Sequence, residues 1–391
     1  MILNRRHLLT GLTATAAFGA AIPRIGHASG VRDPRFVVII LRGALDGLTA
    51  VPPIGDPDYA ALRANLAVEG ALPLDGTFSL HPSLSNFARQ YKAGQALVVH
   101  AAASPYRDRS HFDGQDVLES GQVMPGRTET GWLNRMLMAL PAAQTTRGLG
   151  IGGVTPLVIR GQAPVLGWAP SALKPADADL APRLAALYGQ TDPMLATALN
   201  EAMATGRIAG NNDPAGAAGG PGDPKTMQAM AEGAAKLLAQ PDGPRVCALA
   251  FEGWDTHAAE TTRLTRLLAG LDNALAAFET GLGPAWNDTA VLVMTEFGRT
   301  AAVNGTQGTD HGTATVAFLT GGAVKGGRVI ADWPGLKTSQ LYQNRDLAPT
   351  TDTRSIAKGI MTAFWDLPAS RLSSDIFPDS ASVAPLSGLI A

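Results

Sequence analysis

Phe36-Val-Val-Ile-Ile-Leu41 is a continuously apolar run that is rich in β-branched residues. Such short runs are typical of strands that are buried on both faces, as in a parallel sheet. Four similar runs follow, separated by segments whose apolar residues repeat at helical spacing. The alternation predicts an α/β fold, a three-layer α/β/α sandwich with a mostly parallel central sheet. The further strand runs are 96–100, 246–251, 290–294 and 315–319; the helical ones are 84–91, 131–140, 192–204, 226–238 and 261–282.

The composition of the chain narrows the classes of function. Lys and Arg number 31 and Asp and Glu number 33, so there is no basic excess of the kind that nucleic-acid binding requires, and no nucleic-acid partner is expected. One cysteine, Cys247, excludes an intrachain disulfide and a Cys-rich metal site. Only seven histidines occur, so the positions of those few are informative.

Residues 1–28 have the pattern of an export signal. Arg5-Arg6 precede a weakly apolar stretch, and Gly26 and Ala28 provide small residues at a cleavage site. This leader resembles a twin-arginine signal, so we expect the twin-arginine translocase as a partner during export and a periplasmic or secreted protein. The apolar stretch is too short and too rich in Ala and Gly for a membrane span, and we expect no stable membrane anchor.

Residues 29–391 are expected to form a single domain with two departures from the regular alternation. Residues 145–170 are Gly-rich with β-like pieces, and we expect an insertion there, with a small hairpin beside the sheet. Residues 205–225 are rich in Gly, Pro, Asn and Asp, which predicts a flexible surface loop.

Polar residues gather in five clusters near the ends of the predicted strands. Four clusters follow a strand, and the fifth directly precedes the run at 315–319. In an open α/β sheet, the edge formed by the carboxyl ends of the strands is where ligands bind. The clusters contain Asp46, Arg109-Ser110-His111, Asp255 with His257, Glu296 with Arg299, and Asp310-His311.

These clusters combine the residue types that bind metals. Asp255 and His257 are two positions apart, and in extended backbone such residues project to the same side and could reach one ion. Carboxylate and imidazole ligands suit zinc, manganese or iron(II), and the acids and histidines together could fill one metal site or two. Each cluster also fits a structural role: Asp255 as a helix N-cap, Asp310 as a loop cap, and Glu296 with Arg299 as an ion pair.

Ser110 precedes a segment that could begin a helix, and a hydroxyl at a helix N-terminus lies in a field that favours developing anions. With a metal nearby it could act as a nucleophile, and otherwise it is a plain N-cap. Arg109 and Arg299 could bind the oxyanion of a transferred group, or they could be solvated or paired.

Taken together, the motifs resemble an exported bacterial family of unknown function that is placed in the alkaline phosphatase/sulfatase superfamily. The matching pieces run through nearly the whole chain after the leader; they are Leu41-Arg-Gly-Ala-Leu-Asp-Gly-Leu48, Ser110-His-Phe112, Gly253-Trp-Asp-Thr-His257, Thr295-Glu-Phe-Gly-Arg-Thr300, Gly308-Thr-Asp-His-Gly312 and Gly321-Gly-Ala-Val-Lys-Gly-Gly327. The resemblance implies an alkaline phosphatase-like fold. It also implies that Asp46 corresponds to the superfamily's first metal-site Asp, and Ser110 to its nucleophile.

The chain departs from the superfamily after the run at 290–294, where an Asp-His pair is usual and Glu296-Phe297 stands instead. A second metal would therefore lack a histidine ligand. Either Asp46, Glu296 and His111 hold a second ion, or only one ion binds. The resemblance implies a divalent metal, with zinc as the first expectation and manganese, iron and calcium as open alternatives.

The sequence therefore predicts an exported, metal-dependent hydrolase that acts on phosphate or sulfate esters of small molecules or polymers. The resemblance implies that Asp255, His257 and His311 hold one metal, and we count Asp310 among the further candidate ligands. Ser110 would be the nucleophile, or a metal-activated water would take its place. The alternative is a non-catalytic periplasmic protein, for metal binding or assembly, on a hydrolase-like fold.

Overall fold

The computed structural model describes residues 32–391 apart from 142–145, 172–179, 211–218 and 221. The predicted leader, residues 1–28, lies outside the described residues. The contacts divide the chain into two units, residues 1–33 and residues 34–391, and the second unit contains every helix and strand given below. No helix among the described residues is both long and apolar enough to span a bilayer.

The described part of the chain contains a nine-stranded sheet with the order β10-β4-β9-β8-β1-β7-β5-β6, in which β11 also pairs with β4. Every pairing is parallel except those of β9 with β4 and β8. The strands are β1 (Arg35–Arg42), β4 (Ala96–Ala103), β5 (Gly148–Ile151), β6 (Val165–Trp168), β7 (Val246–Glu252), β8 (Thr289–Thr295), β9 (Thr315–Thr320), β10 (Arg328–Ile330) and β11 (Thr351–Asp352); β2 (Leu72–Pro73) and β3 (Ser79–Leu80) form a separate pair.

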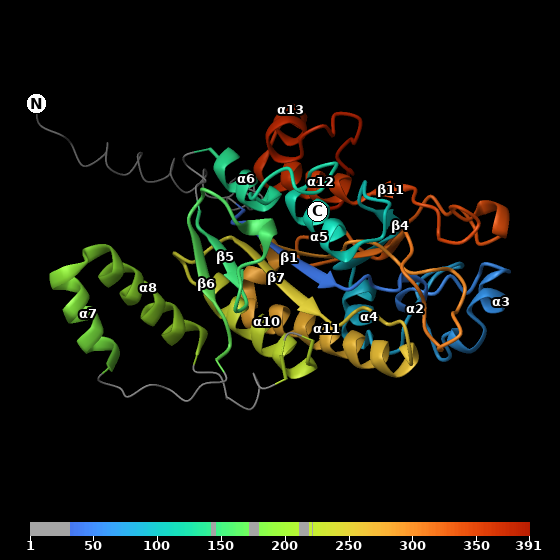
Figure 1. Ribbon diagram of the computed structural model, residues 1–391, viewed down its shortest axis with the longest axis horizontal. Helices are drawn as coiled ribbons and strands as arrows, with labels where there is room; N and C mark the ends of the chain where they lie inside the picture. Colours follow the sequence, from blue (N-terminus) through green and yellow to red (C-terminus); the bar gives the residue numbers. More distant parts are fainter. Residues whose placement is uncertain (1–31, 142–145, 172–179, 211–218, 221) are drawn as a thin grey trace, which may run out of the picture. The chain divides into compact units, whose positions relative to one another are not determined.

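Helices cover both faces of this sheet (Figure 1). The α-helices are α2 (Gly47–Ala50), α3 (Tyr59–Arg63), α4 (Ser85–Lys92), α5 (His111–Ser120), α6 (Trp132–Ala139), α7 (Leu180–Thr191), α8 (Pro193–Ala209), α10 (Pro224–Leu238), α11 (Glu260–Leu282), α12 (Thr353–Trp365) and α13 (Ala369–Arg371). Short 3-10 turns span Ala64–Leu66, Leu157–Ile159, Gly283–Asp288 and Thr338–Gln340, and a π-helical turn spans Leu372–Ile376.

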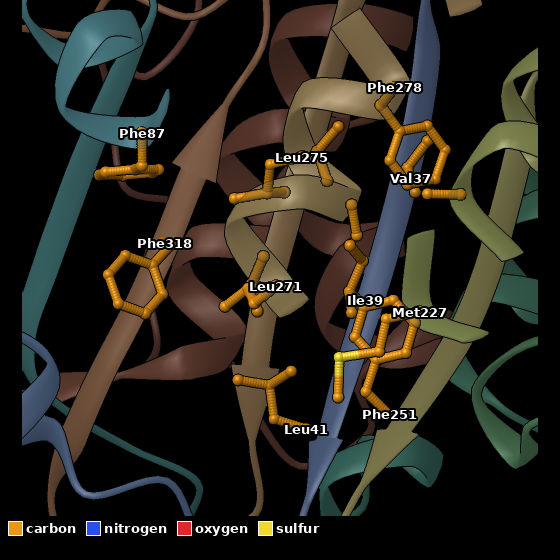
Figure 2. Packing of buried hydrophobic residues seen from close by; sticks show 14 of the residues in the cluster. Val37, Ile39, Leu41, Phe87, Met227, Phe251, Leu271, Leu275, Phe278 and Phe318 are labelled. Atoms are coloured by element: carbon orange, nitrogen blue, oxygen red, sulfur yellow. The ribbon is translucent and has the colours of Figure 1, made fainter. Parts of the chain in front are cut away.

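Alternate residues of β1 point to two hydrophobic cores, one on each face of the sheet. Val37, Ile39 and Leu41 pack with side chains of α10 and α11 (Figure 2). Phe36 and its alternate neighbours pack with α6 and α12 on the opposite face. Both faces of β1 are buried, which explains why its sequence is continuously apolar rather than alternating. The prediction of a three-layer α/β fold with a mostly parallel sheet is therefore confirmed.

The longest helix, α11, forms because its apolar side chains recur every three or four residues and so lie on one stripe. Leu264, Leu268, Leu271 and Leu275 are fully buried on the sheet. Burying each such side chain stabilises the fold by roughly 1.5–3 kcal/mol. The helix begins at Glu260, directly after the loop that holds Asp255 and His257, so this packing fixes where that loop ends.

Two expectations about irregular segments change. The expected hairpin at 145–170 is wrong, because β5 and β6 pair in parallel and extend the central sheet beside β7. A parallel pair needs a crossover, and residues between the two strands supply it through the 3-10 turn Leu157–Ile159. The expected loop at 205–225 is shorter on both sides, since α8 continues to Ala209 and α10 begins at Pro224; residues 211–218 and 221 lie outside the described residues.

Candidate metal centre

The topology brings the five polar clusters to one edge of the sheet. Strands β1, β4, β7 and β8 all end at this edge, because β1, β7 and β8 are mutually parallel and β4 runs antiparallel to β9, which itself opposes β8. Strand β9 runs the other way, so it begins there. This explains why the cluster at Asp310-His311 precedes its strand whereas the other four clusters follow theirs.

Three histidines and one aspartate meet at this edge. The Nε2 atom of His311 lies 2.9 Å from Nε2 of His111 and 3.0 Å from Nε2 of His257. The carboxylate of Asp255 lies 3.0 Å from His257 Nε2, 3.4 Å from His311 Nε2 and 3.5 Å from His111 Nε2. His111 is the first residue of α5, Asp255 and His257 lie in the loop after β7, and His311 lies in the loop before β9; all four side chains are partly exposed to solvent.

The opposite ring nitrogen of each histidine faces a hydrogen-bond acceptor. His111 Nδ1 lies 2.8 Å from a carboxylate oxygen of Glu296, and His257 Nδ1 lies 3.1 Å from one of Asp310. His311 Nδ1 lies 2.9 Å from the backbone carbonyl of Arg109. These acceptors have no proton to give, so each neutral imidazole carries its proton on Nδ1 and presents an unprotonated Nε2.

This arrangement leaves three nitrogen lone pairs close together beside a carboxylate. Lone pairs that face one another at about 3 Å repel unless a cation lies between them. Histidines whose Nδ1 donates to a carboxylate or a carbonyl while Nε2 is free are typical of protein metal sites. Ligand atoms of His111, Asp255 and His311 all lie within 4.8 Å of one another. This set could hold a divalent metal, with His257 as a further ligand.

Glu296 is fully buried and orients His111. Burial alone would raise the pKa of Glu296, but hydrogen bonds from His111, Gln115 and the Gly43 backbone hold it below its ordinary value. The ionised Glu296 in turn raises the pKa of His111. Phe297 stacks on the His111 ring with a centroid separation of 5.0 Å. The Glu-Phe pair that departs from the superfamily pattern therefore fixes the position of one histidine.

Arg299 orients the aspartate. Its guanidinium is fully buried and donates a 2.6 Å hydrogen bond to Asp255 Oδ1, and it also donates to Thr309. Burial would raise the pKa of Asp255, but Arg299 holds that pKa below its ordinary value, so the carboxylate is ionised. Desolvation lowers the pKa of His311, which favours its neutral, ligand-competent form.

Two predicted site residues, Asp46 and Arg109, lie elsewhere or serve another contact. Asp46 is not brought to the histidines, because it caps α2 and its carboxylate is bound by the buried Arg63. The guanidinium of Arg109 donates twice to the buried Asp346, so the part of Arg109 that reaches the cluster is its carbonyl. Both interactions depend on residues distant in sequence, which sequence patterns do not reveal.

Ser110 lies where the sequence places it, at the N-terminus of α5. It is the N-cap residue in extended conformation, and its side chain makes no capping hydrogen bond. Gln115, four residues beyond His111 on the same helix, reaches Glu296 at 3.1 Å and was missed by sequence reasoning. The i, i+4 spacing places both side chains on one helix face and could have identified it.

A glycine allows two of the loops to approach closely. Gly43 has a φ of +119°, and a Cβ atom at this position would lie 2.5 Å from the backbone nitrogen of Asp255. Any larger residue would push apart the loops after β1 and β7. The position of the Asp255 carboxylate therefore depends on a backbone contact that only glycine permits.

The chain is therefore an α/β protein whose mostly parallel sheet carries a candidate metal centre, a cluster of histidines and one aspartate, at its carboxyl edge. The chain belongs to the family described as "Protein of unknown function (DUF1501)", whose model matches residues 33–372. This confirms the predicted resemblance to a family of unknown function. Among curated proteins, none matches the sequence.

Several solved structures are similar to the chain at 10–12% sequence identity. The C-terminal periplasmic domain of EcEptC from Escherichia coli, in complex with Zn, is 10% identical, with 75% of this chain and 74% of that chain covered and a TM-score of 0.39. TAB5 alkaline phosphatase, a mutant with Mg bound, is 11% identical, with 74% and 90% covered and a TM-score of 0.36. A protein in the alkaline phosphatase superfamily from Vibrio parahaemolyticus is 12% identical, with 86% and 67% covered and a TM-score of 0.39.

Proposed function

We propose that the chain is a metal-dependent hydrolase of phosphate or sulfate esters and that one divalent cation binds between His111, Asp255, His257 and His311. One observation carries the proposal: each histidine directs its Nδ1 proton to an acceptor and leaves an unprotonated Nε2 in the same cluster. Unprotonated imidazole nitrogens gathered beside an ionised carboxylate are the donor set that a divalent cation prefers.

The chemistry of the donor set agrees with a zinc-type ion. Imidazole nitrogens with one carboxylate oxygen suit zinc, and also manganese or iron(II). When bound, such an ion polarises an ester oxygen and lowers the pKa of water. Arg63 already neutralises Asp46, the residue on which a second ion would depend, so the proposal is for one ion per chain.

The N-terminus of α5 supplies the second part of the proposed site. The first backbone N–H groups of a helix have no partner within the helix and attract anions. Ser110 stands at this end with a hydroxyl that makes no capping bond, and His111 is the next residue. We therefore propose that the transferred phosphate or sulfate group binds here and that Ser110 is the attacking group.

A second candidate function is a non-catalytic metal-binding or assembly protein. One observation favours it: the guanidinium groups of Arg109 and Arg299 are both bound to carboxylates of this chain. Neither is then available to bind the oxyanion of a substrate. This rival predicts the same metal stoichiometry as the hydrolase but no turnover of esters.

The test begins with the purified protein loaded separately with zinc, manganese, iron(II) and calcium. Metal content and hydrolysis of aryl phosphate, phosphonate and sulfate esters are then measured for the wild type and for Asp255→Asn and His311→Ala. The hydrolase proposal expects turnover that needs the metal and is lost in both variants. As a matched control, Asp108→Asn changes an exposed aspartate in the loop before α5 and should keep the wild-type rate.

The possible outcomes separate the two candidates. Bound metal without turnover of any ester would reject the hydrolase and support the metal-binding rival. Turnover that survives both metal removal and Asp255→Asn would reject the proposed site altogether. Retained metal in His311→Ala would show that the central histidine is not a ligand.

We also propose that residues 1–28 direct export through the twin-arginine translocase. The support is the Arg5-Arg6 pair before an Ala- and Gly-rich apolar stretch. A folded reporter fused to these residues should be exported, and changing both arginines to lysine should retain it in the cytoplasm. Export that is unaffected by the double substitution would contradict this assignment.

A further inference from the structure

Hydrogen bonds connect the candidate metal centre to a second cluster of charged side chains. The proposed hydrolysis does not use this cluster. It consists of Asp46, Arg63 and Glu260, whose side chains are at most 1% exposed. Arg63 Nη2 contacts Asp46 Oδ2 and lies 3.6 Å from Glu260 Oε1. Thr49 Oγ1 lies 2.8 Å from Asp46 Oδ2 and 3.4 Å from Glu260 Oε1. Thr49 therefore bridges the two acids, and their interaction lowers the pKa of Asp46 and raises that of Glu260.

The charges of this cluster balance only if it contains one extra proton. If both carboxylates were ionised, the single guanidinium would neutralise only one of them. The cluster would then carry a net negative charge that is buried away from water, which is strongly unfavourable. Asp46 acts on two other titratable groups: Tyr59, whose pKa burial raises, and His100, whose pKa burial lowers to about 4. Both are therefore neutral at pH 7. Neither compensates the excess negative charge.

The hydrogen-bond directions locate the proton. Arg299 Nε is a donor and lies 3.2 Å from Thr309 Oγ1, so the hydroxyl accepts from the arginine. Thr309 Oγ1 donates its own proton to Glu260 Oε2, which lies 2.6 Å away and is the acceptor. The extra proton therefore lies on the other oxygen, Oε1, which faces Asp46. Burial and the charge of Asp46 raise the pKa of Glu260 to about 9, in agreement with this placement.

The cluster also holds both arms of the hairpin that carries His311. In this hairpin, Arg299 pairs with His311 across the two arms. On one arm, Arg63 Nη1 donates to the carbonyls of Thr300 and Ala301, each at 3.3 Å. On the other arm, Thr309 joins Glu260 to Arg299. Arg299 then donates to Asp255, so a continuous chain of hydrogen bonds links the buried acids to the candidate metal ligands.

We propose that Asp46 and Glu260 share one buried proton, held on Glu260 Oε1, and that this proton-sharing cluster positions the hairpin and the Asp255 carboxylate. Asp46, Arg63 and Glu260 are thus positioning residues that touch neither metal nor substrate. The shared proton stands independently of the proposed hydrolysis. The predicted effect of the proton-sharing cluster on metal affinity does rest on the proposed function, because it requires that a metal binds at Asp255 and the histidines.

The proton is tested directly by infrared spectroscopy of the full chain at neutral pH. We expect a protonated-carboxyl band that shifts in heavy water and is absent from Glu260→Gln. The amide of this variant can still donate to Asp46 and accept from Thr309, so the protein should fold and keep the zinc affinity of the wild type. A spectrum in which Glu260→Gln removes no such band would overturn the shared proton.

The positioning role is tested by Thr309→Val, which breaks the link between Glu260 and Arg299 while keeping the shape of the side chain. Thr256→Val is the matched control, because Thr256 is equally buried and its hydroxyl has no hydrogen-bond partner among the described residues. We expect amide hydrogen exchange over residues 298–313 to rise in Thr309→Val alone. Zinc affinity should fall by about tenfold or more in the same variant.

The outcomes keep this inference separate from the proposed function. If the wild type binds no zinc, the proposed function fails, whereas the infrared band and the hydrogen exchange still decide the shared proton and the positioning role. If the wild type binds zinc but Thr309→Val behaves like Thr256→Val in both measurements, the positioning role is wrong. Loss of folding in Glu260→Gln would show that the amide does not replace a protonated acid and would contradict the shared proton.

Discussion

Replacing Glu296 by glutamine removes one negative charge behind His111 with little change in shape. In the structure, Glu296 Oε1 accepts from Gly43 at 2.8 Å, from His111 at 2.8 Å and from Gln115 at 3.1 Å. A glutamine oxygen can accept all three. Its amide can donate to Thr295 Oγ1, whose own proton can go to the Leu41 carbonyl at 2.7 Å. The fold should therefore survive, and the loss is one of charge.

The expected cost is a weaker metal site. Removing a charged partner of a ligating histidine reduces metal affinity by about 10–100-fold, or roughly 1.4–2.7 kcal/mol. Zinc affinity is measured by competition with a chromophoric chelator, and Glu279→Gln, which removes a surface partner of Arg89, is the control. Equal affinity in Glu296→Gln and the wild type would refute the claim that Glu296 supports His111 as a ligand.

Three further predictions follow from single residues. Ser110→Ala should abolish ester turnover but retain bound metal, measured by assay and metal analysis; retained turnover would mean that water attacks directly. Gly43→Ala should destabilise the protein by at least about 1–2 kcal/mol in urea unfolding and weaken zinc binding, because the left-handed backbone and the contact with Asp255 both oppose a side chain; an unchanged variant would contradict the close packing of these loops. Burial lowers the pKa of His100 to about 4 in the folded protein, against about 6.5 when unfolded, and outweighs the hydrogen bond that its ring donates to the Val51 carbonyl. Stability should therefore fall by about 3 kcal/mol as pH drops through this window, and a His100 NMR titration near 6.5 would contradict it.

The parts of the fold that could be predicted are those whose signal is local. The run Phe36–Leu41 and its counterparts are continuously apolar because both faces of each strand are buried. Strands β5 and β6 escaped prediction as sheet strands because Gly148 and Gly150 carry no β-branched signal. Their parallel pairing is fixed only by β7 and by each other, which are contacts between segments distant in sequence.

The candidate site shows the same division. The residues after β4, β7 and β8 could be placed together because parallel strands end at one edge. The partner of Asp46 could not be predicted, since Arg63 lies in the five-residue helix α3 and its burial is decided by packing. The role of Arg109 was also hidden, because it is the carbonyl, exposed by a φ of 60°, that meets His311.

The measurement that bears most directly on the central claim is the zinc stoichiometry of the purified full chain after chelator treatment and reloading. The account predicts one equivalent of zinc, lost in His311→Ala and retained in Asp46→Asn. Absence of bound metal, or a second equivalent that depends on Asp46, would contradict the account.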